Sequence, residues 1–122
     1  MPTRSLHSSV LRWPKAETVI EALTRWAQKT VKAKPEVLAI GYFGSYARGD
    51  QGVGSDLDVL IIVRACETPF NRRAALWDLT DLPLPADALV YTQAEWQALD
   101  PNKRFQHMLL HETVWVCGSL QS

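Results

Sequence analysis

The fold is decided by a stretch in the middle of the chain. It reads Gly44-Ser45-Tyr46-Ala47-Arg48-Gly49, then a polar loop with two glycines, then Asp56-Leu57-Asp58-Val59-Leu60-Ile61-Ile62-Val63. After Asp58 the second segment is apolar at both odd and even positions, which predicts a β-strand covered on both faces. The two glycines of the first segment bracket a short helix, Ser45 to Arg48. A turn, a short helix and a central strand in this order are typical of a sheet packed between helices.

The pattern extends in both directions from this centre. Upstream, apolar residues recur every three or four positions from Pro14 to Lys34, which predicts an amphipathic helix that Pro35 ends. A buried strand is predicted over 37–43. Downstream, the sequence predicts a helix from Pro69 to about Leu82 and a strand over 86–91. The residues expected to face inward from the 69–82 helix are Ala74, Leu76 or Trp77, and Thr80.

The rest of the chain completes an alternating pattern. Thr92 is expected to cap a helix in a capping box with Glu95. Helices over 93–99 and 102–111 and a short strand over 113–117 follow. The order α-β-α-β-α-β-α-α-β predicts an α/β (α+β) fold, in which a mixed β-sheet is covered by helices.

The pair Gly44-Ser45 comes directly after a predicted strand and opens a helix. Glycine lets a backbone approach a ligand closely, and exposed amides at a helix start attract anions such as phosphate. The Ser45 hydroxyl can add a donor. The alternative interpretation is an ordinary strand-to-helix turn in which Ser45 is the N-cap.

Asp56 and Asp58 flank Leu57 at the start of the central strand. Side chains two positions apart on a strand point to the same face. At about 5 Å and an effective dielectric constant of about 20, the two carboxylates repel each other by roughly 3 kcal/mol. A divalent cation such as Mg²⁺ or Mn²⁺ removes that repulsion. The alternative is a solvated strand entrance with two surface aspartates.

A third acid, Asp87, begins the next predicted strand. A crossover connection joins parallel strands, and parallel neighbours begin at the same end of a sheet. Asp87 is therefore expected beside Asp56 and Asp58. Three carboxylates that face a phosphate-binding turn fit two-metal phosphoryl transfer, with Asp87 as metal ligand or base.

The run from Gly44 to Gly49, followed by Ser55-Asp56-Leu57-Asp58, resembles the signature of the DNA polymerase beta-like nucleotidyltransferase superfamily. The chain is most similar to the minimal nucleotidyltransferases of that superfamily, which are often paired as antitoxins with a HEPN toxin. The spacing between Gly-Ser and Asp-x-Asp is that of the antitoxin subgroup. The ending His111-Glu112-Thr113-Val114-Trp115-Val116 also matches the family. The resemblance implies a nucleotidyltransferase fold over residues 15–118, after an N-terminal extension of residues 1–14.

The resemblance also implies an activity. Such antitoxins transfer AMP from ATP to a tyrosine hydroxyl of the HEPN toxin and so block its RNase activity. By position, Gly44 and Ser45 would hold the triphosphate, and Arg48 would neutralise charge on the phosphates, although it can equally be a surface arginine. Asp56 and Asp58 would bind two Mg²⁺ or Mn²⁺ ions. Asp87 would complete the second metal site and activate the acceptor oxygen.

No residues remain for an acceptor-binding domain once this core is built, so we expect a partner macromolecule to provide the acceptor. Two alternatives stay open. The chain can be a catalytically vestigial antitoxin that neutralises its toxin by contact alone. It can also be a nucleotidyltransferase for small molecules.

Composition agrees with one domain of ordinary kind. The chain has 122 residues, 47% hydrophobic and 21% charged, and a formal net charge of zero. These values exclude disordered and collagen-like chains. The zero charge argues against a nucleic-acid binder, and the longest aliphatic run, Val59 to Val63, is too short for a membrane span. Two cysteines and no apolar stretch after the early arginines lead us to expect a reduced, cytoplasmic protein.

Several other residues have side chains that can take part in binding or chemistry. Residues 1–34 carry a net charge of +5, which we interpret mainly as a solvated helix face. His107 and His111 have metal-compatible spacing but no third ligand, which favours surface roles. Trp13 and Trp96 are expected to pack at the core or its rim, with partner contact as the alternative. Cys66 and Cys117 are expected to be structural.

Overall fold

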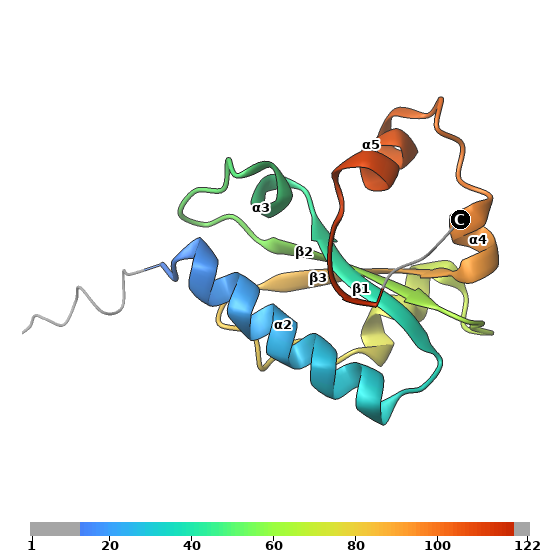
Figure 1. Cartoon of the computed structure of the whole chain (residues 1–122), viewed down its shortest axis with the longest axis horizontal. Coiled ribbons are helices and arrows are strands. Elements are labelled where there is room, and N and C mark those ends of the chain that lie inside the picture. The colour runs from blue at the N-terminus through green and yellow to red at the C-terminus, as the bar shows by residue number, and fades with distance from the viewer. Residues whose placement is uncertain (1–12, 119–122) are drawn as a thin grey trace, which may run out of the picture.

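The computed structural model describes residues 13–118, and its centre is one four-stranded sheet in the order β3-β2-β1-β4 (Figure 1). Strand β1 runs antiparallel to both β2 and β4, whereas β2 and β3 are parallel. The sheet is therefore mixed, as predicted. The strands are β1 (Val37–Phe43), β2 (Leu57–Val63), β3 (Ala86–Thr92) and β4 (Val114–Gly118).

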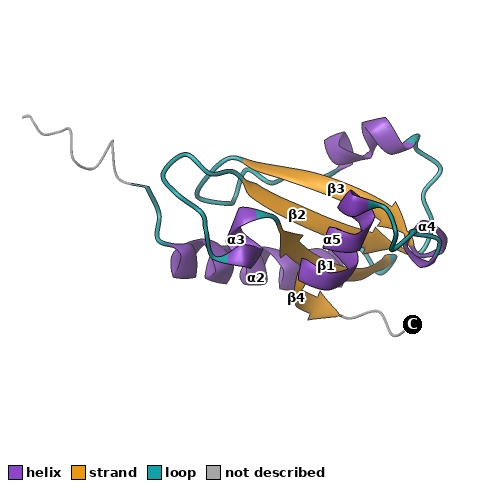
Figure 2. Cartoon of the chain, turned by 90° about the horizontal axis from the view of Figure 1, so that it is seen from above, coloured by secondary structure: helices purple, strands orange, loops and turns teal. Residues whose placement is uncertain are grey.

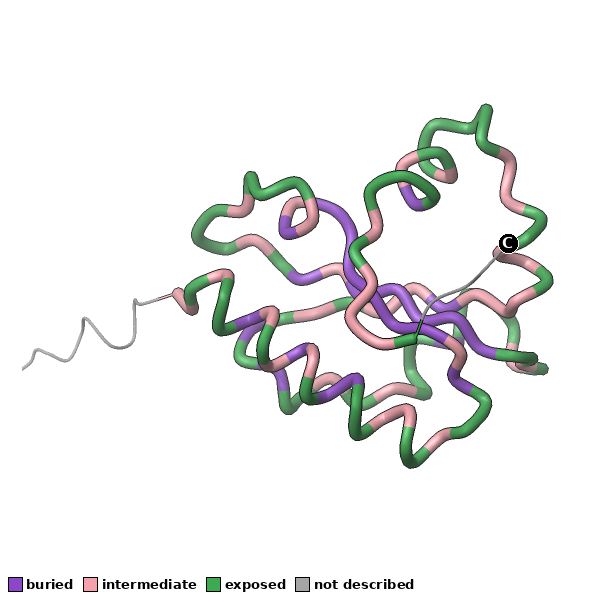
Figure 3. The backbone as a smooth tube through the Cα atoms, viewed as in Figure 1, coloured by how far each residue is buried: buried purple, intermediate pink, exposed green. Residues whose placement is uncertain are grey.

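Helices cover the two faces of the sheet. The long helix α2 (Ala16–Ala33) lies along one face, and α5 (Arg104–Glu112) lies on the other, as Figures 1 and 2 show. The short helix α3 (Ser45–Arg48) follows β1, and its Tyr46 packs in the same apolar cluster as α2. Helix α4 (Gln93–Gln97) follows β3, and the 3-10 helix η1 (Phe70–Leu76) precedes it. The central strands form the buried interior between these layers (Figure 3).

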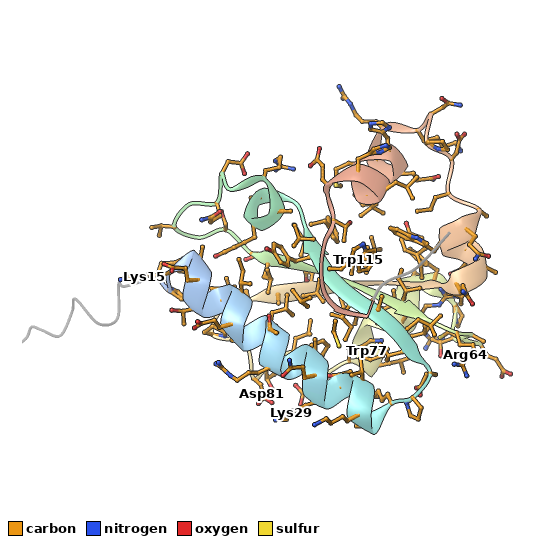
Figure 4. All side chains as sticks on the ribbon, in the orientation of Figure 1. Lys15, Lys29, Arg64, Trp77, Asp81 and Trp115 are labelled. Atoms are coloured by element: carbon orange, nitrogen blue, oxygen red, sulfur yellow. The ribbon has the colours of Figure 1, made fainter. Side chains whose placement is uncertain are left out.

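Two apolar clusters hold the layers together. Beneath the sheet, α2 buries Val19, Leu23 and Trp26 against the strands. Above it, Leu109 of α5 is fully buried and packs over the other face of β1 and β2. Figure 4 shows Trp115 on this second side, across the sheet from α2. Alternate residues of strand β2 pack into each of the two clusters, so both of its faces are apolar. The prediction of a central strand is confirmed.

The prediction of a helix over residues 69–82 is wrong in its length and in the side chains that it places inward. Only Phe70–Leu76 is helical, as a 3-10 helix, and the backbone is already extended at Trp77. Trp77 itself is half-buried. The other residues expected to face inward are all exposed: Ala74, Leu76 and Thr80.

The residue that η1 buries is an arginine. Arg73 is 6% exposed, and its guanidinium donates to both carboxylate oxygens of Glu95, at 2.6 and 3.1 Å. It also donates to the carbonyl oxygens of Thr68, at 2.8 Å, and Val90, at 3.3 Å. Three of these four bonds tie η1 to β3 and α4. A polar network therefore fixes this segment where the apolar pattern predicted a longer amphipathic helix.

The remaining predicted elements are close to their expected bounds. The capping box of Thr92 and Glu95 is confirmed at the start of α4. Helix α2 begins two residues later than the first-turn position assigned to Pro14, with Lys15 as N-cap. Residues 1–12 of the predicted N-terminal extension, residues 1–14, lie outside the described part of the chain. Between residues 13 and 118, no helix combines the length and apolarity needed to cross a membrane.

Candidate active site

Two of the three predicted acids are direct neighbours. In the parallel β2–β3 pair, Asp58 is in register with Asp87. Residues in register on adjacent strands point to the same face, and neighbouring strands lie about 5 Å apart. Asp56 immediately precedes β2, two positions before Asp58. The structure therefore brings the acids together at the end of the sheet where β2 and β3 begin.

The burial of the three carboxylates differs. Asp56 and Asp87 are exposed, whereas Asp58 is half-buried. Partial burial raises the pKa of Asp58, and the negative charges of Asp87 and then Asp56 raise this pKa further. Arg48 acts in the opposite direction by favouring the charged carboxylate. Burial and nearby like charges both disfavour the ionised form of a carboxyl group, so the three acids form a region of strong negative potential.

The Gly44-Ser45 turn lies against the buried acid. Gly44 has φ 78° and ψ −146° and occupies the N-cap position of α3, so the interpretation of Ser45 as N-cap is wrong. A Cβ atom built at Gly44 would overlap Asp58 Oδ2. Glycine is therefore required here for both its backbone conformation and its missing side chain. The first amides of α3 and the Asp58 carboxylate consequently border the same space.

We expect Gly44→Ala to lower catalytic turnover at least tenfold, because the new methyl group pushes the Asp58 carboxylate out of place and the positive φ is strained. Steady-state kinetics with a nucleoside triphosphate as substrate measures this effect. Gly49→Ala is the matched control, since Gly49 has φ 80° but open space around its Cβ position. Equal losses in both variants would show that backbone strain alone is responsible.

Arg48 stands at the rim of this site. It is exposed, and its guanidinium pairs with Asp50 at 3.2 Å and with Glu112 of α5 at 3.6 Å. Surface pairs of this kind contribute little stability, about 0–1 kcal/mol. Arg48 can therefore leave these partners for a phosphate at small cost.

The acids suit a divalent cation that a bound substrate helps to hold. Within residues 13–118, no three acidic, histidine or cysteine side chains converge closely enough to form a metal site by themselves. Mg²⁺ commonly binds one or two carboxylates together with substrate phosphates. Asp58 and Asp87, with Asp56 beside them, offer that donor set next to the Gly44-Ser45 turn.

Comparison with protein-family models matches residues 24–116 to the nucleotidyltransferase domain. The match covers the turn, the three acids and most of the chain. The chain belongs to the nucleotidyltransferase domain family. Members of such a family use a nucleoside triphosphate and a divalent metal, in agreement with the donor set above.

Solved structures share the fold of this nucleotidyltransferase domain. A proposed nucleotidyltransferase from Sulfolobus solfataricus has a TM-score of 0.58 at 18% identity, over 84% of this chain and 87% of that chain. A chain from a mutant of the toxin–antitoxin MntA-HpeT has a TM-score of 0.53 at 13% identity, over 79% of this chain and 73% of that chain. The nucleotidyltransferase fold is thereby confirmed. No curated protein matches the sequence significantly.

The histidine, tryptophan and cysteine residues considered above have packing or surface positions in the nucleotidyltransferase domain. The rings of His107 and His111 are exposed and stack with centroids 4.0 Å apart. Trp96 is half-buried and packs edge-on against Trp115 at 5.5 Å. Cys66 and Cys117 are free thiols.

Sequence reasoning missed the side chains that support the turn from outside the motif. Trp13 is half-buried, and its indole N–H donates to the Tyr46 hydroxyl at 3.4 Å, next to Ser45. Glu112 reaches Arg48 from the other side. Both contacts join residues more than thirty positions apart, so no local pattern could have indicated them.

Proposed function

We propose that the chain transfers AMP from ATP to a tyrosine hydroxyl of a cognate HEPN RNase toxin and acts as its antitoxin. The observation that carries this proposal is the register of Asp58 with Asp87, beside a turn that leaves no room for a side chain at Gly44. The fold shared with the toxin–antitoxin MntA-HpeT supports the choice of partner. The catalytic domain would comprise residues 15–118.

Each residue has a task in the proposed reaction, and Asp87 has two. The amides of the Gly44-Ser45 turn and the Ser45 hydroxyl bind the triphosphate, and Arg48 neutralises its charge. Asp56 and Asp58 hold the divalent cations, with Asp87 as a further ligand. Bound Mg²⁺ supplies charge neutralisation at the phosphates.

The transfer itself balances without any further reactant. A bond forms between the acceptor oxygen and the α-phosphorus of ATP, the bond from that phosphorus to the bridging oxygen breaks, and pyrophosphate leaves. The acceptor proton passes to the Asp87 carboxylate. Asp87 is suited to this role because it is exposed at the entrance of the site, whereas Asp58 is half-buried.

Labelled ATP tests the proposal. The purified chain is incubated with Mg²⁺ and the protein encoded by the adjacent gene, using ATP labelled at either the α- or the γ-phosphate. We expect the α-label alone to appear on a partner tyrosine, and the partner's RNase activity to be lost with it. Asp56→Ala should lose the labelling while the complex remains.

Two outcomes would contradict this proposal. Inhibition of the RNase without label, equal in the wild type and in Asp56→Ala, would identify an antitoxin that acts by contact alone. Label that appears only on small molecules would identify a small-molecule transferase.

A further inference from the structure

One edge of the sheet is open next to the candidate catalytic acids. Strand β3 is the outermost strand on its side, and β2 is its only strand partner among the described residues (Figure 2). Asp87, which we propose receives the acceptor proton, lies on this edge strand. An open sheet edge offers unpaired N–H and C=O groups that can bind another extended backbone.

The hydrogen bonds show which groups of β3 face outward. In a parallel pair, alternate residues direct both N–H and C=O toward the neighbouring strand. The Leu57 N–H donates to the Pro85 carbonyl at 3.0 Å, so Pro85 faces β2. By the same alternation, Asp87 and Leu89 face β2, whereas Ala86 and Ala88 face away from it.

The far part of the same edge is closed. Val90 also faces outward by this alternation, and its carbonyl oxygen accepts a hydrogen bond from buried Arg73 at 3.3 Å. Helix η1 contacts β3, and this hydrogen bond places Arg73 of η1 against Val90. Among the described residues, no hydrogen bond occupies the outward N–H and C=O groups of Ala86 and Ala88, which flank Asp87, so these groups are free to pair.

An apolar hollow adjoins the open edge. Its volume is about 320 Å³, and both Pro85 and Ala86 border it. It can accept an aliphatic side chain from a segment that pairs with β3. Its lining residues are Leu79, Thr80, Leu82, Leu84, Pro85 and Ala86.

We infer that an extended segment of the protein that bears the acceptor hydroxyl binds as an added strand at Ala86–Ala88. This inference rests on the proposed function and specifies how its substrate is held. Main-chain bonds to the outward groups of Ala86 and Ala88 fix the segment, and the hollow takes one of its apolar side chains. Neighbouring strands lie about 5 Å apart, so a hydroxyl-bearing residue beside Asp87 on the same face comes within reach of its carboxylate.

The substitution Ala88→Pro tests this mode of binding. Proline removes the outward N–H of Ala88 and adds bulk at the edge, but leaves intact the bonds of Asp87 and Leu89 to β2. We expect transfer of AMP to the adjacent-gene protein to fall at least tenfold, while the affinity for Mg-ATP changes less than twofold. Gln93→Pro is the control, because the first position of α4, at the far end of β3, tolerates proline.

Amide exchange of the wild-type chain provides a second measurement that needs no variant. In the complex, we expect the N–H groups of Ala86 and Ala88 to gain protection, with those of Asp87 and Leu89 as internal references. Transfer by Ala88→Pro at the wild-type rate, or no gain in protection, would overturn the inference and leave the proposed function standing. Protection that grows with the concentration of the chain alone would identify a second copy as occupant and also overturn it. Gained protection without any AMP transfer would instead refute the proposed function.

Discussion

Asp58→Asn is expected to abolish nucleotidyl transfer and at the same time to stabilise the metal-free protein. Turnover should fall about a thousandfold or more, because the amide lacks the negative charge that a divalent cation requires. The free energy of unfolding should rise by about 1 kcal/mol, since removing the Asp58 charge ends its repulsion with Asp87, which is in register on the adjacent strand. For a domain of this size that corresponds to a melting temperature about 4 °C higher.

The gain in stability should depend on pH. In the folded state the pKa of Asp58 is raised by burial, Asp87 and Asp56, so ionisation of this carboxyl costs the folded protein stability. That cost is present at neutral pH and disappears as the pH falls below the ordinary aspartate range, where the carboxyl is protonated in both states. The difference between Asp58→Asn and the wild type should therefore shrink on acidification.

Thermal melts in a chelating buffer, together with labelled-ATP kinetics, measure both effects. Asp81→Asn is the control, because Asp81 is an exposed aspartate paired only loosely with Lys29, at 3.8 Å, across from α2 (Figure 4). It should change neither activity nor stability. A fall in the melting temperature of Asp58→Asn would show that the carboxylate stabilises the fold and contradict the electrostatic account.

Arg73→Ala should have the largest effect on folding. The substitution removes four hydrogen bonds and leaves the Val90 carbonyl and one side of Glu95 without a partner. Removing one member of a buried ion pair costs 3–5 kcal/mol, and the partial exposure of Glu95 favours the lower end. We expect a loss of about 3 kcal/mol in the free energy of unfolding.

Urea titration measures this loss, and Arg72→Ala is the matched control because Arg72 is an exposed neighbour on η1. The Arg73 guanidinium lowers the pKa of Glu95, so this contribution is complete above the ordinary glutamate pKa and is lost as the pH falls through the lowered value. The two variants should thus become more alike in acid. Equal stability of the two variants at neutral pH would refute the role of the ion pair.

The sequence sufficed for those parts of the structure that depend on local patterns and on topology. Strand β1 has the predicted bounds. The apolar run between Pro35 and Gly44 is too short for a typical helix, so a buried strand is the structure that its pattern indicates. The approach of Asp87 to Asp58 could be predicted because a crossover connection forces parallel strands to begin together.

The parts that could not be predicted depend on polar contacts between distant residues. No local pattern distinguishes Arg73 from a solvent-exposed arginine, and its partner Glu95 lies on another element. Only the tertiary fold brings them together, and their bond reorients the whole segment after Pro69. The same holds for Trp13 with Tyr46 and for Arg48 with Glu112. Hydrophobic periodicity carries no information on such pairs.

The two ends of strand β3 have different roles: one lies at the candidate active site, and the other is held by an ion pair that stabilises the fold. The acids lie where β3 begins, and the Arg73–Glu95 ion pair lies where it ends. The two ends are about 16 Å apart, given the rise per residue of a β-strand. Substitutions that strengthen the Arg73–Glu95 ion pair need not disturb the positions of Asp58 and Asp87. Stability can therefore be raised at the end of β3 that is remote from the acids, where a substitution is not expected to alter the candidate active site.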